Sequence, residues 1–188
     1  MKNHSVVVIF LFSVFLTACV KDRIVPVDNP GPSELPIGNG YLFINEFVVK
    51  GSMNANEYGT NEDWIEIYNP QNIAITLAAD SWYISDNGQT NPYKYKLPQL
   101  TIPAKGYLVI WCDGLNKVDN QIHTNFNLSA AGEDLILYYH PSTLESGITV
   151  DQYAYSTHSI DGASEGRYPD GGSQWQFFTI PSIGVSNN

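Results

Sequence analysis

From Tyr41 to about Val185 the chain consists of short β-rich runs separated by turn signals. No stretch offers ten residues of helical periodicity, whereas several runs alternate apolar and polar residues with the period of two that a half-buried strand requires. The predicted strands span residues 42–49, 64–68, 73–77, 82–85, 93–97, 107–111, 135–139 and 149–155. Short strands at this regular spacing predict an all-β fold, a β-sandwich.

The composition supports a packed domain and argues against one class of partner. Aromatic residues make up 13% of the chain, far more than a disordered chain carries. Nine Lys and Arg stand against 19 Asp and Glu, giving a formal net charge of −10. A nucleic-acid binder needs a basic surface to replace phosphate counterions, so we expect no nucleic-acid partner.

The N-terminus carries the pattern of a secretory signal. Residues 6–16 are apolar apart from Ser13, and this run is shorter than the roughly 20 residues that a membrane-spanning helix needs. The tetrapeptide Leu16-Thr17-Ala18-Cys19 follows and resembles a bacterial lipobox. We therefore predict a lipoprotein signal peptide over residues 1–18 and a lipid on Cys19. An ordinary signal peptide cleaved after Ala18 is the alternative.

A linker rich in proline and glycine follows, and we predict that residues 19–40 form a tether. Lys21-Asp22, just after Cys19, resembles the export signal of surface lipoproteins in the Bacteroidetes lineage. Two or more acyl chains hold a protein stably on a membrane. We expect a protein anchored to the cell envelope through the lipid, in the outer membrane, with exposure at the cell surface left open.

Six sequence blocks resemble those of lamin tail domains, in the same order along the chain. They are residues 42–47, 63–70, 82–86, 97–111, 123–133 and 166–171. The resemblance implies an immunoglobulin-like β-sandwich over residues 41–188. In bacteria such domains occur in secreted and membrane-anchored proteins, sometimes beside hydrolase domains.

No motif in the sequence supports catalysis. There is no G-x-S-x-G, no phosphate-binding loop and no paired histidines at metal-ligand spacing. His123, His140 and His158 are scattered and are interpreted as turn residues, and Cys112 follows an apolar strand and is interpreted as a buried small side chain. We expect a protein that is not an enzyme and holds no cofactor.

Aromatic side chains offer one candidate binding surface. Trp64, Trp82 and Trp111 lie in apolar blocks and are predicted to be buried, so Trp82 and Trp175 are the less favoured candidates for stacking on sugars. Tyrosines that alternate with lysines beside a polar loop are better candidates for exposed rings. The predicted surface comprises Tyr93, Tyr95, Asn87 and Gln89.

A polar loop offers a second, weaker candidate. Residues 54–63 are rich in side-chain oxygens, and calcium takes six to eight oxygen ligands. The spacing does not match a known calcium loop, so we expect no metal. The weak candidates are Asn56, Glu57, Glu62 and Asp63.

Two functional hypotheses follow. The first is an envelope-anchored domain that binds or scaffolds an unknown protein or glycan partner without chemistry of its own. The second is an extracellular carbohydrate- or calcium-binding module that assists a partner hydrolase. An exposed aromatic platform or a cluster of carboxylates would favour the second, whereas a polar surface with every tryptophan buried would favour the first.

We predict that Cys19→Ser abolishes incorporation of labelled fatty acid and releases the protein from membranes, because Cys19 supplies the thiol that the lipid acylates. Metabolic labelling followed by membrane fractionation checks this. Cys112→Ser, which removes the other cysteine of the chain, is the control and should keep the label. Unchanged fractionation of Cys19→Ser would contradict the anchor.

Overall fold

The described part of the chain, residues 37–158 and 160–187 of a computed structural model, is built from thirteen β-strands and contains no helix. Consequently it holds no helix long and apolar enough to cross a membrane. The predicted signal peptide, Cys19 and most of the predicted tether lie outside the described residues. The strands are β1 (Phe43–Val48), β2 (Asp63–Tyr68), β3 (Ile75–Leu77), β4 (Trp82–Ser85), β5 (Tyr95–Lys96), β6 (Leu100–Ile102), β7 (Tyr107–Cys112), β8 (Lys117–Val118), β9 (Ile122–His123), β10 (Glu133–Tyr139), β11 (Ile148–Tyr155), β12 (Ser164–Arg167) and β13 (Trp175–Phe178).

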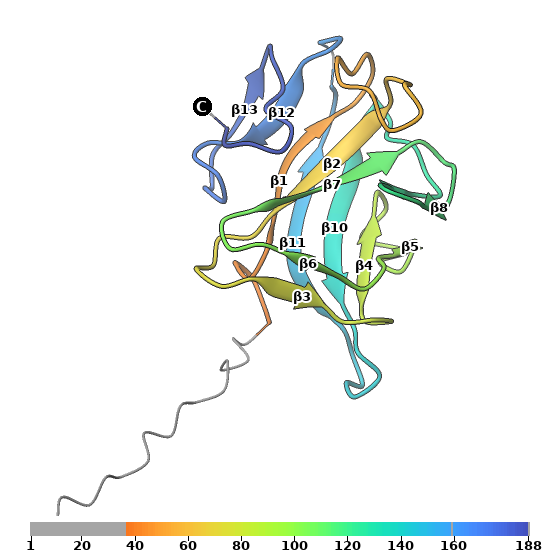
Figure 1. Ribbon diagram of the computed structural model, residues 1–188, viewed down its shortest axis with the longest axis vertical. Coiled ribbons are helices and arrows are strands. Elements are labelled where there is room, and N and C mark those ends of the chain that lie inside the picture. The colour runs from red at the N-terminus through yellow and green to blue at the C-terminus, as the bar shows by residue number, and fades with distance from the viewer. Residues whose placement is uncertain (1–36, 159, 188) are drawn as a thin grey trace, which may run out of the picture. The chain divides into compact units, whose positions relative to one another are not determined.

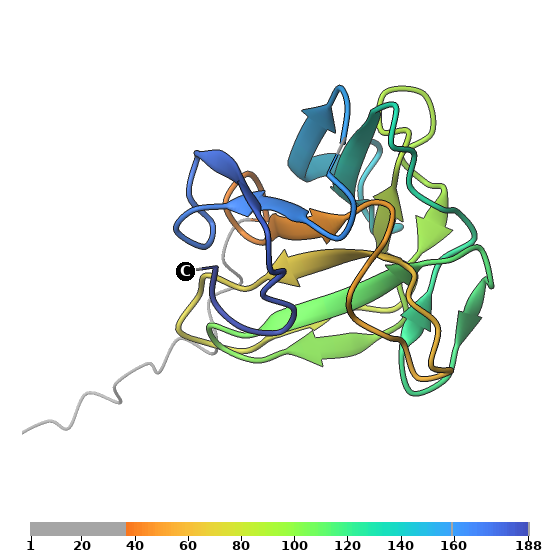
Figure 2. The ribbon, with the colours of Figure 1, turned by 90° about the horizontal axis from the view of Figure 1, so that it is seen from above.

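The strands form two main sheets and a small ribbon (Figure 1). A seven-stranded sheet has the order β13-β12-β1-β2-β7-β9-β8, a four-stranded sheet has the order β11-β10-β4-β5, and β3 pairs with β6. Seen from above, β1, β2 and β7 lie side by side (Figure 2). All neighbours run antiparallel except β7 and β9. The predicted all-β, immunoglobulin-like β-sandwich is confirmed.

One hydrophobic core lies between the two sheets. A bulge between Ile44 and Glu46 shifts the alternation in β1, so that Ile44 and Phe47 both face the core while Glu46 faces outward. The seven-stranded sheet also contributes Ile65 and Ile67. The other sheet contributes Trp82, Ile84, Leu135, Leu137 and Val150. These alternating inner positions are what the period-two pattern predicts.

Every predicted strand run contains a strand, but β6, β8, β9, β12 and β13 were not predicted. Three of these are only two or three residues long, too short to show a period. β12 has the sequence Ser-Glu-Gly-Arg, with no apolar residue, although all four positions are buried. In β7 only the last three residues are buried, whereas Tyr107, Leu108 and Val109 remain partly exposed.

The folded domain begins before Tyr41. Ile37, which the sequence analysis assigns to the tether, packs against the core, and the backbone N–H of Tyr41 donates to the carbonyl of Gly38 in a turn, at 3.0 Å. The side chain of Gln71 also donates to the carbonyl of Gly40. Residues 37–40 are therefore part of the fold.

The predicted burial of three tryptophans is confirmed, and so is that of Cys112. Trp82 lies in the core between the sheets. Trp64 and Trp111 instead lie on the outer face of the seven-stranded sheet, where they form a second cluster with Val48 and Ile183. The C-terminal segment that carries Ile183 therefore has a packing function.

We predict that Trp111→Ala lowers the free energy of unfolding by about 3–5 kcal/mol, because it removes a buried ring and leaves a cavity. Thermal or denaturant unfolding measures the change. Val118→Ala in β8 is the control, since Val118 is 51% exposed and should change stability by less than about 0.5 kcal/mol. A Trp111→Ala protein that unfolds like the wild type would show that the second cluster contributes nothing to stability.

Candidate functional site

An ordered group of aromatic rings lies on the outer side of the four-stranded sheet. Tyr83 of β4 and Tyr138 of β10 are cross-strand partners. Tyr93, from the connection between β4 and β5, packs edge-on against both, with ring centroids 5.1 Å from Tyr83 and 5.2 Å from Tyr138. The Tyr93 hydroxyl is hydrogen-bonded to Nδ1 of His140 at 2.7 Å. We name Tyr83, Tyr93, Tyr138 and His140 the tyrosine face.

Within the tyrosine face, Tyr93 is exposed and is held in place by its partly buried neighbours. Tyr93 is 44% exposed, and edge-to-face contacts fix its ring without covering it. Hydrogen bonding to Tyr138, together with partial desolvation, raises the pKa of Tyr93, so its hydroxyl stays protonated. Sequence analysis missed Tyr83 and Tyr138. Their signal was available, since Tyr83 stands between two core residues of β4 and must point the other way.

Tyr95 does not belong to this surface, so its prediction as an exposed ring was wrong. Tyr95 pairs with Ile84, is only 6% exposed and joins the core. The period-two rule fails between Tyr93 and Tyr95 because β5 begins only at Tyr95. Lys94 between them bonds both oxygens of Asp86, at 2.6 Å each.

Asn87 and Gln89 are exposed, as predicted, in the same connection that carries Tyr93. The side-chain oxygen of Asn87 accepts from the hydroxyl of Thr90 at 2.8 Å. Gly88 between them lies so close to the sheet that a Cβ would fall 2.7 Å from the Cβ of Ile136. The connection therefore lies flat on the outer side of β10, and only a glycine fits there.

Trp175 is not an open stacking platform. Its ring is stacked on that of Tyr153, with centroids 3.6 Å apart and an interplanar angle of 13°. The guanidinium of Arg167 lies over it at 4.8 Å. Both contacts occupy the ring that a sugar would need.

The weak calcium candidates do not converge on one point. The side-chain oxygen of Asn56 accepts from the backbone of Tyr58 and Thr60, and Asp63 accepts from the backbone of Lys50 and Leu128. Glu57 accepts from the N–H groups of residues 120 and 121. Glu62 lines a hollow together with Tyr58, Thr60, Asp113 and Leu115. Across residues 37–158 and 160–187, no group of three or more His, Cys, Asp or Glu is arranged to hold a metal ion.

His123 is not a turn residue, contrary to the interpretation from sequence. It is fully buried in β9, with Nδ1 2.6 Å from Asp113 and Nε2 3.3 Å from Glu57. His158 is also buried, and its Nε2 is 3.0 Å from the carbonyl of Ala163. These contacts hold the loop residues Asp113 and Glu57 against β9, and His158 against the residue that precedes β12.

Burial raises the pKa of the Cys112 thiol well above its usual value, so it remains a thiol rather than a nucleophilic thiolate.

Two carboxylates on the outer face of the seven-stranded sheet hold the C-terminal segment. Glu46 and Glu66 are cross-strand partners in β1 and β2, and both are fully buried. Glu46 accepts from the backbone N–H of Ser182 at 3.0 Å, and Glu66 accepts from that of Gly184 at 2.6 Å. Asn45, next to Glu46 in β1, likewise accepts from the backbone N–H of Gly171 at 3.0 Å.

The same arrangement sets the protonation of these groups. Burial raises the pKa of Glu66 to about 8, although the N–H groups of Gly184 and Asn45 donate to it and oppose the shift. Burial also raises the pKa of Glu46. Both carboxyl groups are occupied by the protein's own donors, which is typical of a structural role.

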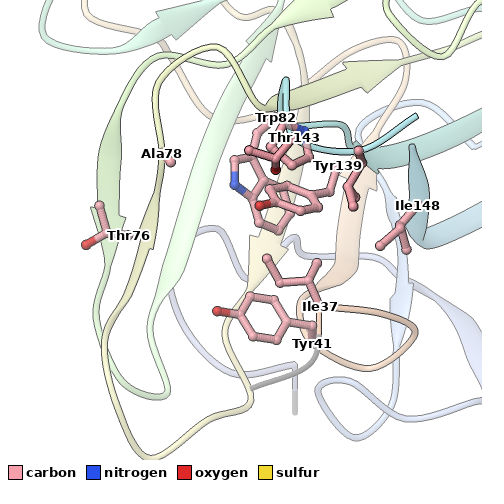
Figure 3. Close-up of a pocket in the computed structure, with 10 residues that line it drawn as sticks. Ile37, Tyr41, Thr76, Ala78, Trp82, Tyr139, Thr143 and Ile148 are labelled. Carbon is pink, nitrogen blue, oxygen red and sulfur yellow. The ribbon is translucent and has the colours of Figure 1, made fainter. Parts of the chain in front are cut away.

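A hollow opens at one end of the sandwich (Figure 3). Its volume is about 410 Å³, and it is open to solvent. Ile37 and Tyr41, which precede β1, form one part of its lining, and the first residue of β4, Trp82, lies against them. We name it the Trp82 hollow, with the further lining residues Thr76, Ala78, Tyr139, Pro141, Thr143, Leu144 and Ile148.

We predict that Glu66→Gln flattens the dependence of stability on pH. Because the pKa of Glu66 is higher in the folded protein than in the unfolded chain, its contribution is fully present below about pH 4.5 and is lost as the pH rises through about 8. The contribution at stake is on the order of 4 kcal/mol. Unfolding midpoints from pH 4 to pH 8.5 measure it, with Glu145→Gln at an exposed loop position as the control. An unaltered pH slope in Glu66→Gln would contradict the assignment.

Comparison with known proteins identifies the fold's family. The family model described as Lamin Tail Domain matches residues 36–157. The match includes both candidate binding regions, while β12, β13 and the C-terminal segment lie beyond it. A search of curated proteins finds no match for the chain. Since the family model covers well over half of the 188 residues, the protein belongs to the lamin tail domain family.

Proposed function

We propose that the protein is a lipid-anchored component of a bacterial cell envelope whose lamin tail domain binds or scaffolds a partner without catalysis. Lamin tail domains are generally non-catalytic modules, and the family is shown here by the match over residues 36–157. The observation that carries binding, of either a protein or a glycan, is the tyrosine face, in which the exposed ring of Tyr93 is held in place by Tyr83 and Tyr138.

The contrast between the two outer sheet faces supports this choice of surface. The outer face of the seven-stranded sheet is covered where Ile183 packs near Trp64 and Trp111 and where Glu46 and Glu66 hold the C-terminal segment. On the four-stranded sheet, the ring of Tyr93 remains 44% exposed. Tyrosines are enriched among the residues that dominate binding energy at interfaces, because a rigid ring offers a large contact area at a small entropic cost.

The chemistry of the buried polar groups is consistent with a module that does not catalyse a reaction. Glu46 and Glu66 each accept from backbone N–H groups, and His123 is enclosed by Asp113 and Glu57. Cys112 is buried and its pKa is raised. Each of these groups has a structural partner or a structural environment.

The anchoring part of the proposal rests on the sequence around Cys19. Leu16-Thr17-Ala18-Cys19 resembles a lipobox, and the residues before it have the length and apolarity of a signal peptide. A lipid on Cys19 would insert into the outer membrane and hold the folded domain outside the bilayer. Exposure of the domain at the cell surface is left open. The Cys19→Ser variant tests this part independently of binding.

A carbohydrate-binding module that assists a partner hydrolase is the second candidate. The exposed ring of Tyr93 favours it, because aromatic rings stack on the C–H faces of sugars. The calcium part of that hypothesis has no such support, since the oxygens of Asn56, Glu57 and Asp63 are engaged by the protein's own donors. A protein partner and a glycan partner are distinguished by the experiment below.

We predict that Tyr93→Ala abolishes capture of the partner while lowering stability by only about 1–3 kcal/mol, the energy of its two edge-to-face contacts. Cross-linking on intact cells, followed by mass spectrometry for proteins and lectin blotting for glycans, measures the capture. Tyr95→Ala is unsuitable because Tyr95 is a core residue.

Phe177→Ala is the matched control, since Phe177 is also 44% exposed but lies on β13 in the other sheet. Capture should be retained in this variant. Equal capture by wild type and Tyr93→Ala would remove the tyrosine face from the proposal, and turnover of a glycan by the purified protein would overturn the non-catalytic role.

A further inference from the structure

β13 forms one edge of the seven-stranded sheet and lies at the margin of the domain (Figure 1). It pairs only with β12. The backbone N–H of Tyr168 donates to the carbonyl of Gln174 at 2.9 Å, so the backbone groups of Gln174 face the β12 side. Because backbone groups alternate along a strand, those of Trp175 and Phe177 face the other way. Within residues 37–158 and 160–187, no strand lies on that side of β13.

The other edge strands of the two main sheets each carry a charged residue, whereas β13 carries none. β8 contains Lys117, β5 contains Lys96 and β11 contains Asp151. Charged residues and prolines on an edge strand oppose pairing with another chain. β13 has the sequence Trp-Gln-Phe-Phe, with neither a charge nor a proline. The feature that protects the other three edges is therefore missing from this one.

The segment around β13 is also uncharged and partly apolar. Residues 171–188 contain no Asp, Glu, Lys or Arg, in a chain whose net charge is −10. Phe177 is 44% exposed, and Ile180, just after the strand, is 77% exposed. The charged residues of the adjacent β12, Glu165 and Arg167, are buried. A second copy with the same net charge therefore meets no like charge on β13 itself.

We propose that β13 pairs edge to edge, in the antiparallel direction, with β13 of a second copy of this chain. A two-fold axis at Gln176 sets Trp175 of each copy opposite Phe177 of the other. These are the two residues of the strand whose backbone groups face the open edge, so this register uses all of those groups. Each such pair exchanges two backbone hydrogen bonds.

The same register joins aromatic side chains across the two copies. The ring of Trp175 is stacked on Tyr153, and Arg167 lies over it, so Phe177 of the second copy contacts the edge of the indole. Aromatic pairs favour edge-to-face contact, and cross-strand aromatic pairs stabilise a sheet. The two-fold axis makes this contact twice, as a self-complementary dimer interface requires. An extended peptide of another protein would need aromatic residues at matching positions, whereas a second copy has them.

The pairing of β13 goes beyond the proposed function, which rests on the tyrosine face of the other sheet. Tyr93→Ala leaves β13 unchanged and should therefore keep the dimer. Phe177→Ala loses the aromatic contact between copies but leaves the tyrosine face intact, so it remains the control for capture of a partner. Each proposal can thus fail without the other.

Engineered cysteines in the full chain test the register. In Gln176→Cys the two thiols meet at a non-hydrogen-bonded pair, where Cα atoms lie about 4.5 Å apart, within the range of a disulfide. We expect a covalent dimer on a non-reducing gel after oxidation, and none from the wild type, whose Cys112 is buried.

Gln174→Cys is the matched control, because Gln174 is also an exposed glutamine on this segment. In the proposed register its two copies lie four residues apart along the strands, about 13 Å, which a disulfide does not span. We expect this variant to stay monomeric on the same gel.

Opposite charges at the axis supply a second measurement. Gln176→Lys and Gln176→Glu each place like charges opposite each other, so each should weaken dimerisation at least about threefold. Mixing the two variants pairs opposite charges and should restore the dimer. Sedimentation velocity of the full chain in detergent measures the dimer fraction. Gln176 is exposed, so neither change should unfold the monomer.

Three results would overturn the proposal. These are equal disulfide yields in Gln176→Cys and Gln174→Cys, a wild type that sediments as a monomer at the concentrations used for oxidation, and a mixture of the two charge variants that dimerises no better than either alone. A covalent adduct of Gln176→Cys with a different protein, in place of the dimer, would assign this edge to that protein instead.

Discussion

The pairing of β1 with β2 is the constraint on which the rest of the structure depends. Each strand places one set of side chains between the sheets and the other set on the outer face. The pair therefore determines which side chains must be covered on both faces of the sheet. The inward-facing side chains of Phe47 and Ile65 are part of the hydrophobic core. Outward, Glu46 and Glu66 stand next to each other, and two neighbouring carboxyl groups on a covered surface need donors. The C-terminal segment supplies them through its backbone N–H groups.

This division explains why the two outer faces of the sandwich differ. The seven-stranded sheet carries buried carboxyl groups and two tryptophans outward, and covering them stabilises the domain. The four-stranded sheet carries Tyr83 and Tyr138 outward, and amphipathic rings of this kind tolerate water. The outer face of the seven-stranded sheet is therefore covered by the C-terminal segment, whereas the outer side of the four-stranded sheet leaves the ring of Tyr93 exposed.

Sequence reasoning predicted most of the framework and only part of the candidate site. The strand-rich run at residues 42–49, the alternating run at 64–68 and the continuous apolar runs at 107–111 and 135–139 predicted β1, β2, β7 and β10 correctly, because strand interiors are marked by alternating or continuous apolar residues. β12 was not predicted because its residues are buried through polar contacts, such as that between Arg167 and Asp151, and such residues give no apolar pattern in the sequence. The exposure of Tyr93 was predicted correctly and that of Tyr95 was not. The position at which the two-residue strand β5 begins depends on its pairing with β4, which the sequence does not show. His123 was misassigned for a related reason, since its partners Asp113 and Glu57 are brought to it only by the fold.

The attachment of the C-terminal segment also has a consequence for how the domain reaches its native state. The bond from Ser182 to Glu46 closes a sequence separation of 136 residues, and that from Gly184 to Glu66 closes one of 118. Contacts this distant contribute only after most of the chain has been ordered, and folding rates fall as such contacts come to dominate. During synthesis from the N-terminus, the earliest strands must wait for some of the last residues before their outer face is sealed. Until Ile183 packs against the cluster of Trp64 and Trp111, that cluster is incomplete, and exposed apolar surface of this kind favours aggregation.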